Sequence, residues 1–137
     1  MTKTGKSPAR KLKYPVPAYH FVLAALKHTQ ESLGYIRKKG DSEEQSHVTG
    51  QELCRGFRDF AQQQLGLMAM TVFRQWGLQS TDDIGEIVFE LIERGEMRKT
   101  EQDQLSDFFD VYDFREAFEK NYQIDVSHAF DATRSEA

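Results

Sequence analysis

Apolar residues recur with a helical period along most of the chain, most clearly between Thr81 and Arg94. In that segment one face of an α-helix is marked by residues three and four apart, namely Ile84, Ile87, Val88, Leu91 and Ile92. Hydroxyls at Ser80 and Thr81 can accept from the free backbone N–H groups at the start, and Gly95 can take the left-handed conformation that ends a helix. The pattern predicts an amphipathic helix over residues 81–94.

A second helical pattern ends immediately before this one. Its apolar side carries Met68, Val72 and Trp76, and Gly77 follows as a helix-ending residue. Because residues 77–80 form a short link, the two helices should meet at a steep angle. Residues 65–97 therefore resemble a helix-turn-helix pair in outline.

Two further helices are predicted nearer the N-terminus. The first begins near Ala18, after two prolines that disfavour helix in the residues before them, and ends in a basic run at residues 37–40. The second begins at Thr49, where Thr49 and Glu52 match a capping box, and runs to about Gln64. Its buried face is predicted to contain Leu53, Cys54, Phe57, Phe60 and Ala61. Gly66 then permits a bend.

After Gly95 the helical period is lost. Two short strands and a turn fit residues 96–114, with apolar side chains inward at Phe108, Tyr112 and Phe114 and carboxylates in solvent at Asp107, Asp110 and Asp113. Asp113 and Glu116 form another capping-box pair, which predicts a short last helix. We therefore predict a mostly α fold: a compact helical domain with a helix-turn-helix-like pair and a small β-hairpin, which together are winged-helix-like.

Length and composition place these elements in one domain. A chain of 137 residues is long enough for one hydrophobic core, and its ten Phe predict an aromatic-rich one. We divide it into a disordered basic tail (1–13), a single helical domain (14–122) and a polar C-terminal tail (123–137). No apolar run approaches the roughly 20 residues that span a bilayer. The first residues lack a signal-peptide core and the single Cys54 has no partner, so we expect a cytoplasmic location.

Few residues suggest catalytic chemistry. The sequence contains no glycine-rich phosphate loop, no paired metal histidines and no nucleophile elbow. Carboxylates at Asp103, Asp107, Asp110 and Asp113 could bind a divalent cation if a loop gathered them, but their spacing does not match a calcium loop. His47 beside Glu52 could form an acid–base pair, although a histidine at a helix start is the simpler interpretation. We predict no enzyme activity and no catalytic, cofactor or metal site.

Particular stretches of the sequence resemble a small family of uncharacterised bacterial proteins of unknown function. The resemblance is carried by YPVPAYHFVLAAL at Tyr14 to Leu26, HVTGQEL at His47 to Leu53, the WG of Trp76 and Gly77, TDDIGEIVFELIERG at Thr81 to Gly95 and DVYDF at Asp110 to Phe114. It extends from about Tyr14 to Phe118. It implies one intact domain, and it brings no activity, substrate or catalytic residue to this chain.

The distribution of charge suggests how such a domain could act. Residues 1–80 carry twelve Lys and Arg against six Asp and Glu, whereas residues 81–137 carry six against sixteen. We predict a protein-interaction or regulatory module whose unidentified protein partner is basic and meets an acidic helix face, with the binding residues Asp82, Glu86, Phe89, Glu90 and Glu93. The alternative interpretation is a winged-helix-like, nucleic-acid-binding regulator that uses the basic N-terminal half, including Arg55, Arg58 and Arg74. A third interpretation is that the carboxylates only solvate the helix.

Overall fold

The fold is mostly helical, as the sequence predicts, in a computed structural model that describes residues 12–34 and 47–120. The four main helices are α1 (Val16–Gly34), α2 (Gly50–Leu65), α3 (Ala69–Trp76) and α4 (Thr81–Glu93). Short helical turns follow at η3 (Gly66–Met68), η4 (Leu105–Phe108) and η5 (Glu116–Lys120). Both predicted tails lie outside the described residues, except for residues 12 and 13 of the N-terminal one. Residues 121 and 122 at the end of the predicted domain, and the predicted end of the first helix at residues 37–40, also lie outside them.

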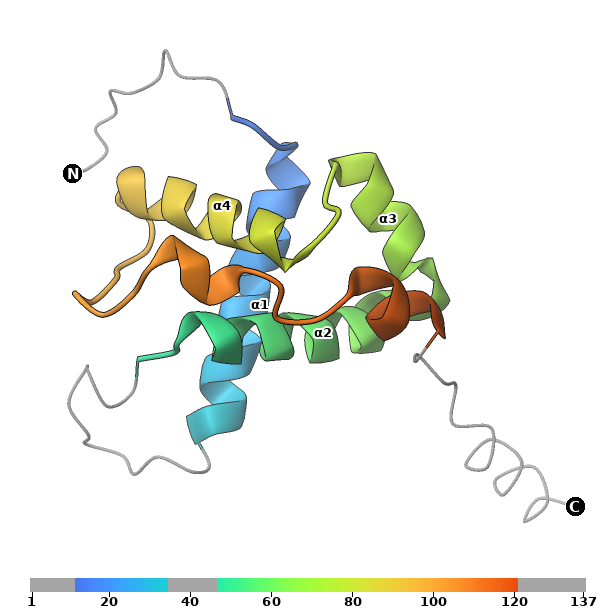
Figure 1. Cartoon of the computed structure of the whole chain (residues 1–137), viewed down its shortest axis with the longest axis horizontal. Helices are drawn as coiled ribbons and strands as arrows, with labels where there is room; N and C mark the ends of the chain where they lie inside the picture. Colours follow the sequence, from blue (N-terminus) through green and yellow to red (C-terminus); the bar gives the residue numbers. More distant parts are fainter. Residues whose placement is uncertain (1–11, 35–46, 121–137) are drawn as a thin grey trace, which may run out of the picture.

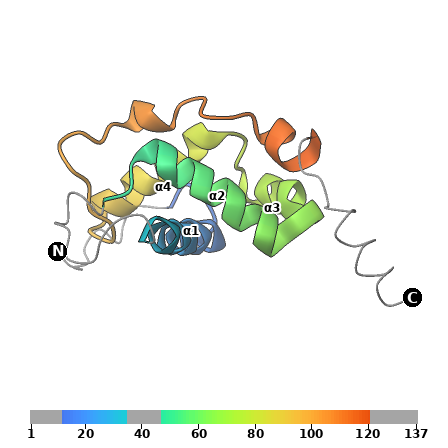
Figure 2. The same ribbon diagram turned by 90° about the horizontal axis from the view of Figure 1, so that it is seen from below.

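The helices are arranged around α2. Figure 2 shows α1 on one side of α2 and the segment of about residues 100–120 on the opposite side. The helix α4 packs against α1 and α2, and α3 runs in a clearly different direction from α4 (Figure 1). This arrangement leaves α4 and the segment that follows it together on one face of the molecule.

The predicted helix boundaries are confirmed by hydrogen bonds. Thr49 Oγ1 accepts from the N–H of Glu52 at 3.1 Å, and the Glu52 carboxylate accepts from the N–H of Thr49 at 3.0 Å, so the capping box of α2 is complete. Ser80 caps α4 in the same way with Asp83. Gly77 adopts the left-handed conformation that ends α3, with a φ of 80°.

The predicted aromatic core is also confirmed. Phe57 and Phe73 are fully buried, with ring centroids 5.2 Å apart, and Phe73 lies a further 5.2 Å from the ring of Phe118. Phe114 and Phe118 meet edge to face at 5.2 Å, so the last turn closes the end of the core that α2 and α3 leave open. Cys54 is fully buried, as predicted.

One predicted helix face is confirmed only in part: Val72 and Trp76 pack against the core, but Met68 does not. Met68 is 57% exposed, whereas Ala69, Met70 and Phe73 form the buried side of α3. The cause is an interruption before α3, where Gly66 has a φ of 53° and residues 66–68 form a separate turn. Met68 therefore lies in this turn, before α3 begins at Ala69, and not on a face of the helix.

The predicted β-hairpin is wrong, because no strand forms within residues 96–114, and the winged-helix interpretation therefore lacks its wing. The side chains of Asp103 and Asp107 accept from the N–H groups of Thr100 at 2.8 Å and Gln104 at 3.0 Å. Each carboxylate thus folds its own short stretch into a turn, which competes with pairing between strands. The inward placement of Phe108 and Phe114 is nevertheless confirmed.

Phe108 fastens this irregular segment to the helices. Its ring lies where two glycines leave room, Gly50 at the start of α2 and Gly85 in the middle of α4. A Cβ atom at Gly85 would lie 2.7 Å from Phe108 Cβ, and one at Gly50 would lie 3.1 Å from Phe108 Cε2. Glycine within a helix costs about 1 kcal/mol relative to alanine. The close packing of Phe108, which is 4% exposed, gives a reason for that cost.

We therefore expect Gly85→Ala to destabilise the protein, because the added methyl group overlaps Phe108. The expected loss in the free energy of unfolding is about 1–3 kcal/mol, typical of overpacking. Urea denaturation followed by circular dichroism measures it. The matched control is Gly34→Ala at the end of α1, where no described atom lies within 4 Å of the new Cβ. Equal stability of the two variants would show that Phe108 is not tightly held.

Candidate functional site

Two of the carboxylates predicted to bind a partner are already used inside the molecule. The Tyr19 hydroxyl donates to Glu90 Oε1 at 2.6 Å, and the Tyr14 hydroxyl donates to Asp83 Oδ1 at 2.6 Å and lies 3.2 Å from Glu86 Oε1. Lys13 forms an ion pair with Glu86. Burial, followed by these hydrogen bonds, raises the pKa of Tyr14 well above its usual value and that of Tyr19 to about 12. The start of α1 is therefore tied to the acidic face of α4.

The other predicted residues of α4 have different environments. Phe89 is half-buried and its ring meets that of Phe108 edge to face at 6.3 Å. Glu93 is exposed at the end of the helix. The five predicted residues thus lie on one helix but do not form one open acidic surface.

Asp82 has a further role, since it fixes the turn after Phe108. Asp82 Oδ1 accepts from the N–H of Asp110 at 3.1 Å, and Thr81 Oγ1 accepts from the N–H of Val111 at 3.1 Å. Asp110 has a φ of 52°, which is uncommon for a residue other than glycine. The turn places Phe108 inward and leaves Phe109 49% exposed, with Leu105 38% exposed on the preceding turn.

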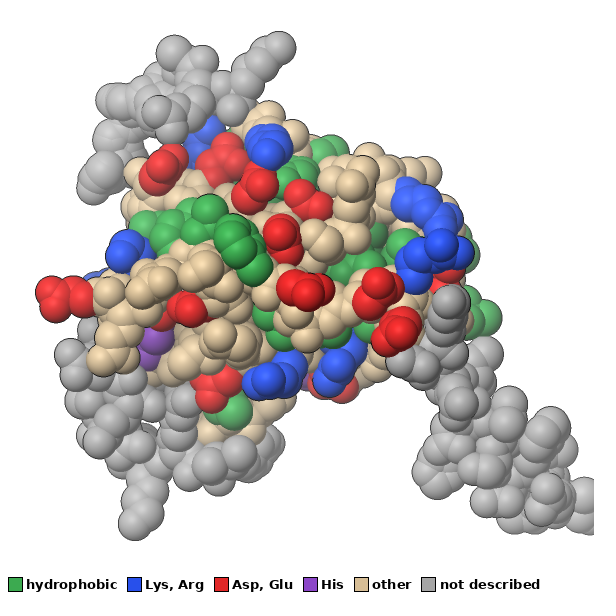
Figure 3. Space-filling model, in the orientation of Figure 1, with side chains coloured by type: hydrophobic (Ala, Val, Ile, Leu, Met, Phe, Trp, Pro, Cys, Tyr) green, Lys and Arg blue, Asp and Glu red, His purple; other side chains and the backbone are tan. Residues whose placement is uncertain are grey.

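We call Asp82, Leu105, Phe109 and Asp110 the Phe109 surface. In Figure 3, acidic side chains run across α4 and the segment that follows it, and an apolar patch lies beside them. An exposed aromatic ring beside carboxylates is a combination that protein-binding surfaces use. Phe109 is exposed, whereas Phe89 and Phe108 pack against each other.

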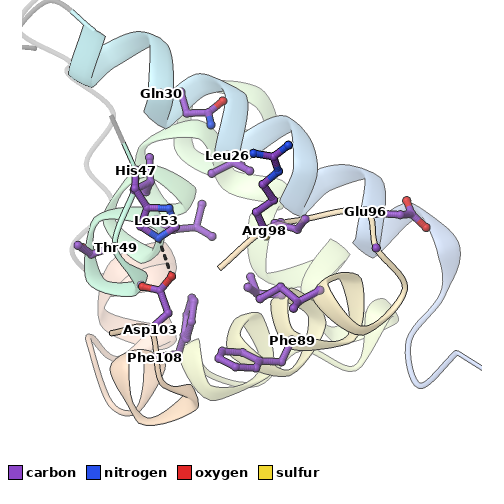
Figure 4. A pocket seen from close by; sticks show the side chains of 16 residues that line it. Leu26, Gln30, His47, Thr49, Leu53, Phe89, Glu96, Arg98, Asp103 and Phe108 are labelled. Carbon is purple, nitrogen blue, oxygen red and sulfur yellow. Dashed lines mark hydrogen bonds and ion pairs between the residues drawn. The ribbon is translucent and has the colours of Figure 1, made fainter. Parts of the chain in front are cut away.

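A cavity of about 460 Å³ lies on the other side of Phe108, between α1, α2 and α4. Its walls are mainly apolar, from Leu26, Val48, Leu53, Val88, Phe89, Ile92, Met97 and Phe108. Figure 4 shows Phe89 and Phe108 along one wall and Leu26 across from them. Polar side chains at its edge include Gln30, His47, Arg98 and Asp103. Its volume lies within the range of about 300–1,000 Å³ common for small-molecule sites.

His47 and Asp103 form a hydrogen-bonded pair at one end of this cavity (Figure 4). His47 Nε2 lies 2.6 Å from Asp103 Oδ2, and both side chains are mostly shielded, 24% and 16% exposed. The sequence offers Glu52 as the partner of His47, but Glu52 is engaged in the capping box of α2. No pattern in the sequence indicates the observed pair, because Asp103 lies 56 residues away in a segment without helical or strand period.

The four aspartates considered for a cation take part in different local contacts and do not form one site. Asp103 binds His47, Asp107 accepts from the N–H of Gln104, and Asp113 accepts from the N–H of Glu116 at 3.1 Å. Within residues 12–34 and 47–120, no three His, Cys, Asp or Glu side chains are grouped as a metal would need.

Burial raises the pKa of the Cys54 thiol to about 12, which disfavours the reactive thiolate.

The arginines considered for nucleic acid take part in contacts within the fold. Arg74 forms an ion pair with Glu119 at 2.6 Å, and the Arg58 guanidinium lies 5.2 Å from the ring centroid of Tyr112. Arg55 is exposed. These side chains therefore do not form one continuous basic surface free of acidic neighbours.

No protein-family model, curated protein or solved structure matches this chain. The resemblance to a bacterial family consequently stays a prediction. In the part of the chain that the structure describes, no helix has both the length and the apolar character needed to cross a membrane.

The link between Tyr19 and Glu90 predicts a pH dependence. Unfolded Tyr19 ionises near its usual pKa of 10.0 and the folded residue near 12, so the folded state holds this proton more tightly. The stabilisation is fully present below pH 10 and is lost as the pH rises to 12. Tyr19→Phe should lower the free energy of unfolding by about 1–2 kcal/mol at neutral pH, since it removes a hydrogen bond to a carboxylate.

Urea denaturation at intervals from pH 8 to 12 measures this effect, and the variant should lose less stability than the parent across the upper half of that range. Tyr14 is unchanged in both proteins and serves as an internal reference. Parallel curves for the two proteins would show that the Tyr19 hydroxyl is not held by Glu90.

Proposed function

We propose that this chain is a non-enzymatic protein-interaction or regulatory module that binds a basic partner protein through the Phe109 surface. The observation that carries the proposal is the outward ring of Phe109, which is 49% exposed although its backbone is fixed. A rigidly presented aromatic side chain loses little conformational entropy on binding, so it makes an efficient anchor.

The charges around this ring favour a basic partner. Asp110 follows Phe109 directly and Asp82 Oδ1 accepts from the Asp110 N–H, so two carboxylates lie on the same turn as the ring, where negative charge attracts Lys and Arg and raises the rate of association. Binding should therefore weaken as salt is added, because exposed charges are screened. The same charges repel phosphates, which makes α4 a poor recognition helix for nucleic acid.

The structure also changes which residues a test should replace. Reversing the charges of Glu86 and Glu90 would break the hydrogen bonds of Tyr14 and Tyr19, so lost binding could not be separated from lost folding. Phe109 is a better choice, since its ring contributes little to the buried core.

We expect Phe109→Ala to reduce partner capture by at least tenfold, the effect of removing a binding anchor worth more than about 1.4 kcal/mol. The tagged chain is incubated with nuclease-treated lysate of its source organism, and bound proteins are quantified by mass spectrometry. The control is Leu67→Ala on η3, which removes another exposed apolar side chain, 66% exposed, at a position outside the Phe109 surface.

The same set of stoichiometric partners on both variants would contradict the proposal. Proteins that are captured from untreated lysate but not from nuclease-treated lysate would instead favour the nucleic-acid alternative and the basic N-terminal half. Once a partner is purified, its affinity for the chain should fall steadily between low and high salt. An affinity independent of salt would show that the carboxylates beside Phe109 do not contribute to binding.

A further inference from the structure

The cavity behind Phe108 is a second place where the molecule can bind something. Its volume of about 460 Å³ far exceeds the roughly 30 Å³ that one water molecule occupies. The space is open to solvent on one side, and a mainly apolar cleft with a few polar groups at its edge is the usual form of a small-molecule site. Phe108 faces this cavity while Phe109 faces outward, so a ligand here does not depend on the proposed protein interaction.

The apolar walls of the cavity indicate the apolar portion of the ligand. Leu26 from α1, Leu53 from α2 and Val88 from α4 surround the space, and the rings of Phe89 and Phe108 stand at 90° to each other on one side. Because Phe108 is held between Gly50 and Gly85, this wall is fixed before a ligand arrives. An aromatic ring or branched hydrocarbon would gain from leaving water here.

The polar side chains at the edge of the cavity indicate which polar group the ligand should carry. His47 and Asp103 satisfy each other at 2.6 Å, and Asp103 is held in turn by the N–H of Thr100 at 2.8 Å. Arg98 and Glu96 carry opposite charges on the same stretch of chain, and Figure 4 shows the Glu96 side chain directed away from the cavity. Arg98 is exposed to water and Asp103 is already paired with His47, so a charged ligand would gain little from either side chain and would still lose its hydration, whereas a hydroxyl or amide loses less and can hydrogen-bond to the pair.

We propose that this cavity binds a small, uncharged amphipathic molecule, with its apolar ring or branched chain between Leu26, Phe89 and Phe108 and one hydrogen-bonding group at His47 and Asp103. A ligand of this kind would bridge α1, α2 and α4, which otherwise meet around an open space. Its binding should stabilise the folded chain.

Three molecules with the same ring and different polar groups test the proposal: benzyl alcohol, benzylamine and benzoate. Each is titrated into the ¹⁵N-labelled full chain and followed by amide chemical shifts. Benzyl alcohol should give saturable shifts at residues of the cavity wall with a Kd on the order of 1 mM, as expected for a ligand so small. Benzylamine and benzoate should bind at least tenfold more weakly.

A pair of variants locates the site. Leu26→Trp places a larger side chain in the cavity and should abolish the shifts, whereas Leu23→Trp makes the same change on the same helix at a residue that does not line the cavity and should preserve them. If Leu26→Trp fails to fold, the site is located in the unchanged chain by intermolecular nuclear Overhauser effects. We expect these effects between benzyl alcohol and the rings of Phe89 and Phe108, and their absence would contradict binding in the cavity.

Several results would overturn the proposal. Shifts that do not saturate, or that persist in folded Leu26→Trp, would place benzyl alcohol elsewhere. Equal or tighter binding of benzylamine or benzoate would exclude an uncharged ligand. Loss of benzyl alcohol binding on addition of the partner captured through the Phe109 surface would show that the cavity accepts a side chain of that protein instead.

Discussion

The position of Phe108 between Gly50 and Gly85 holds the irregular second half of this protein against its helices. Residues 96–114 contain no strand, so they cannot be held by a ladder of backbone hydrogen bonds. They are held instead by the buried rings of Phe108 and Phe114 and by contacts from the start of α4, where Thr81 and Asp82 accept from two N–H groups of the following turn. Because neighbouring residues in this turn point in opposite directions, burying Phe108 also exposes Phe109.

The acidic face of α4 shows that charge in a sequence does not specify its use. Glu86 and Glu90 give the helix the appearance of a free acidic surface, yet the hydroxyls of Tyr14, which precedes α1, and Tyr19, which lies within it, bind them. The hydrogen bond from Tyr19 satisfies the Glu90 carboxylate, which is largely shielded from water and would be costly to leave unpaired. The acidic groups available to a partner are shifted toward Asp110 and the turn that carries Phe109.

The two proposed sites are formed by the same segment of the chain and differ in the kind of ligand they suit. The Phe109 surface presents an anchor outward among negative charges, and the cavity offers an apolar space with a self-satisfied His47–Asp103 pair. Both are formed by the same segment, residues 96–110, as it crosses α2 and α4. Its aspartates therefore serve mainly to shape turns and to position neighbouring groups.

The sequence by itself determined the helices, because their period and caps are local. The capping box of Thr49 and Glu52, the glycine stop at Gly77 and the apolar face of α4 all depend on residues within a few positions of one another. Only the tertiary structure decided the irregular segment, the break at Gly66 that separates Met68 from α3 and the pairing of His47 with Asp103. In each case the deciding contact or break either joins residues far apart in the chain or depends on a backbone angle, and neither leaves a periodic pattern in the sequence.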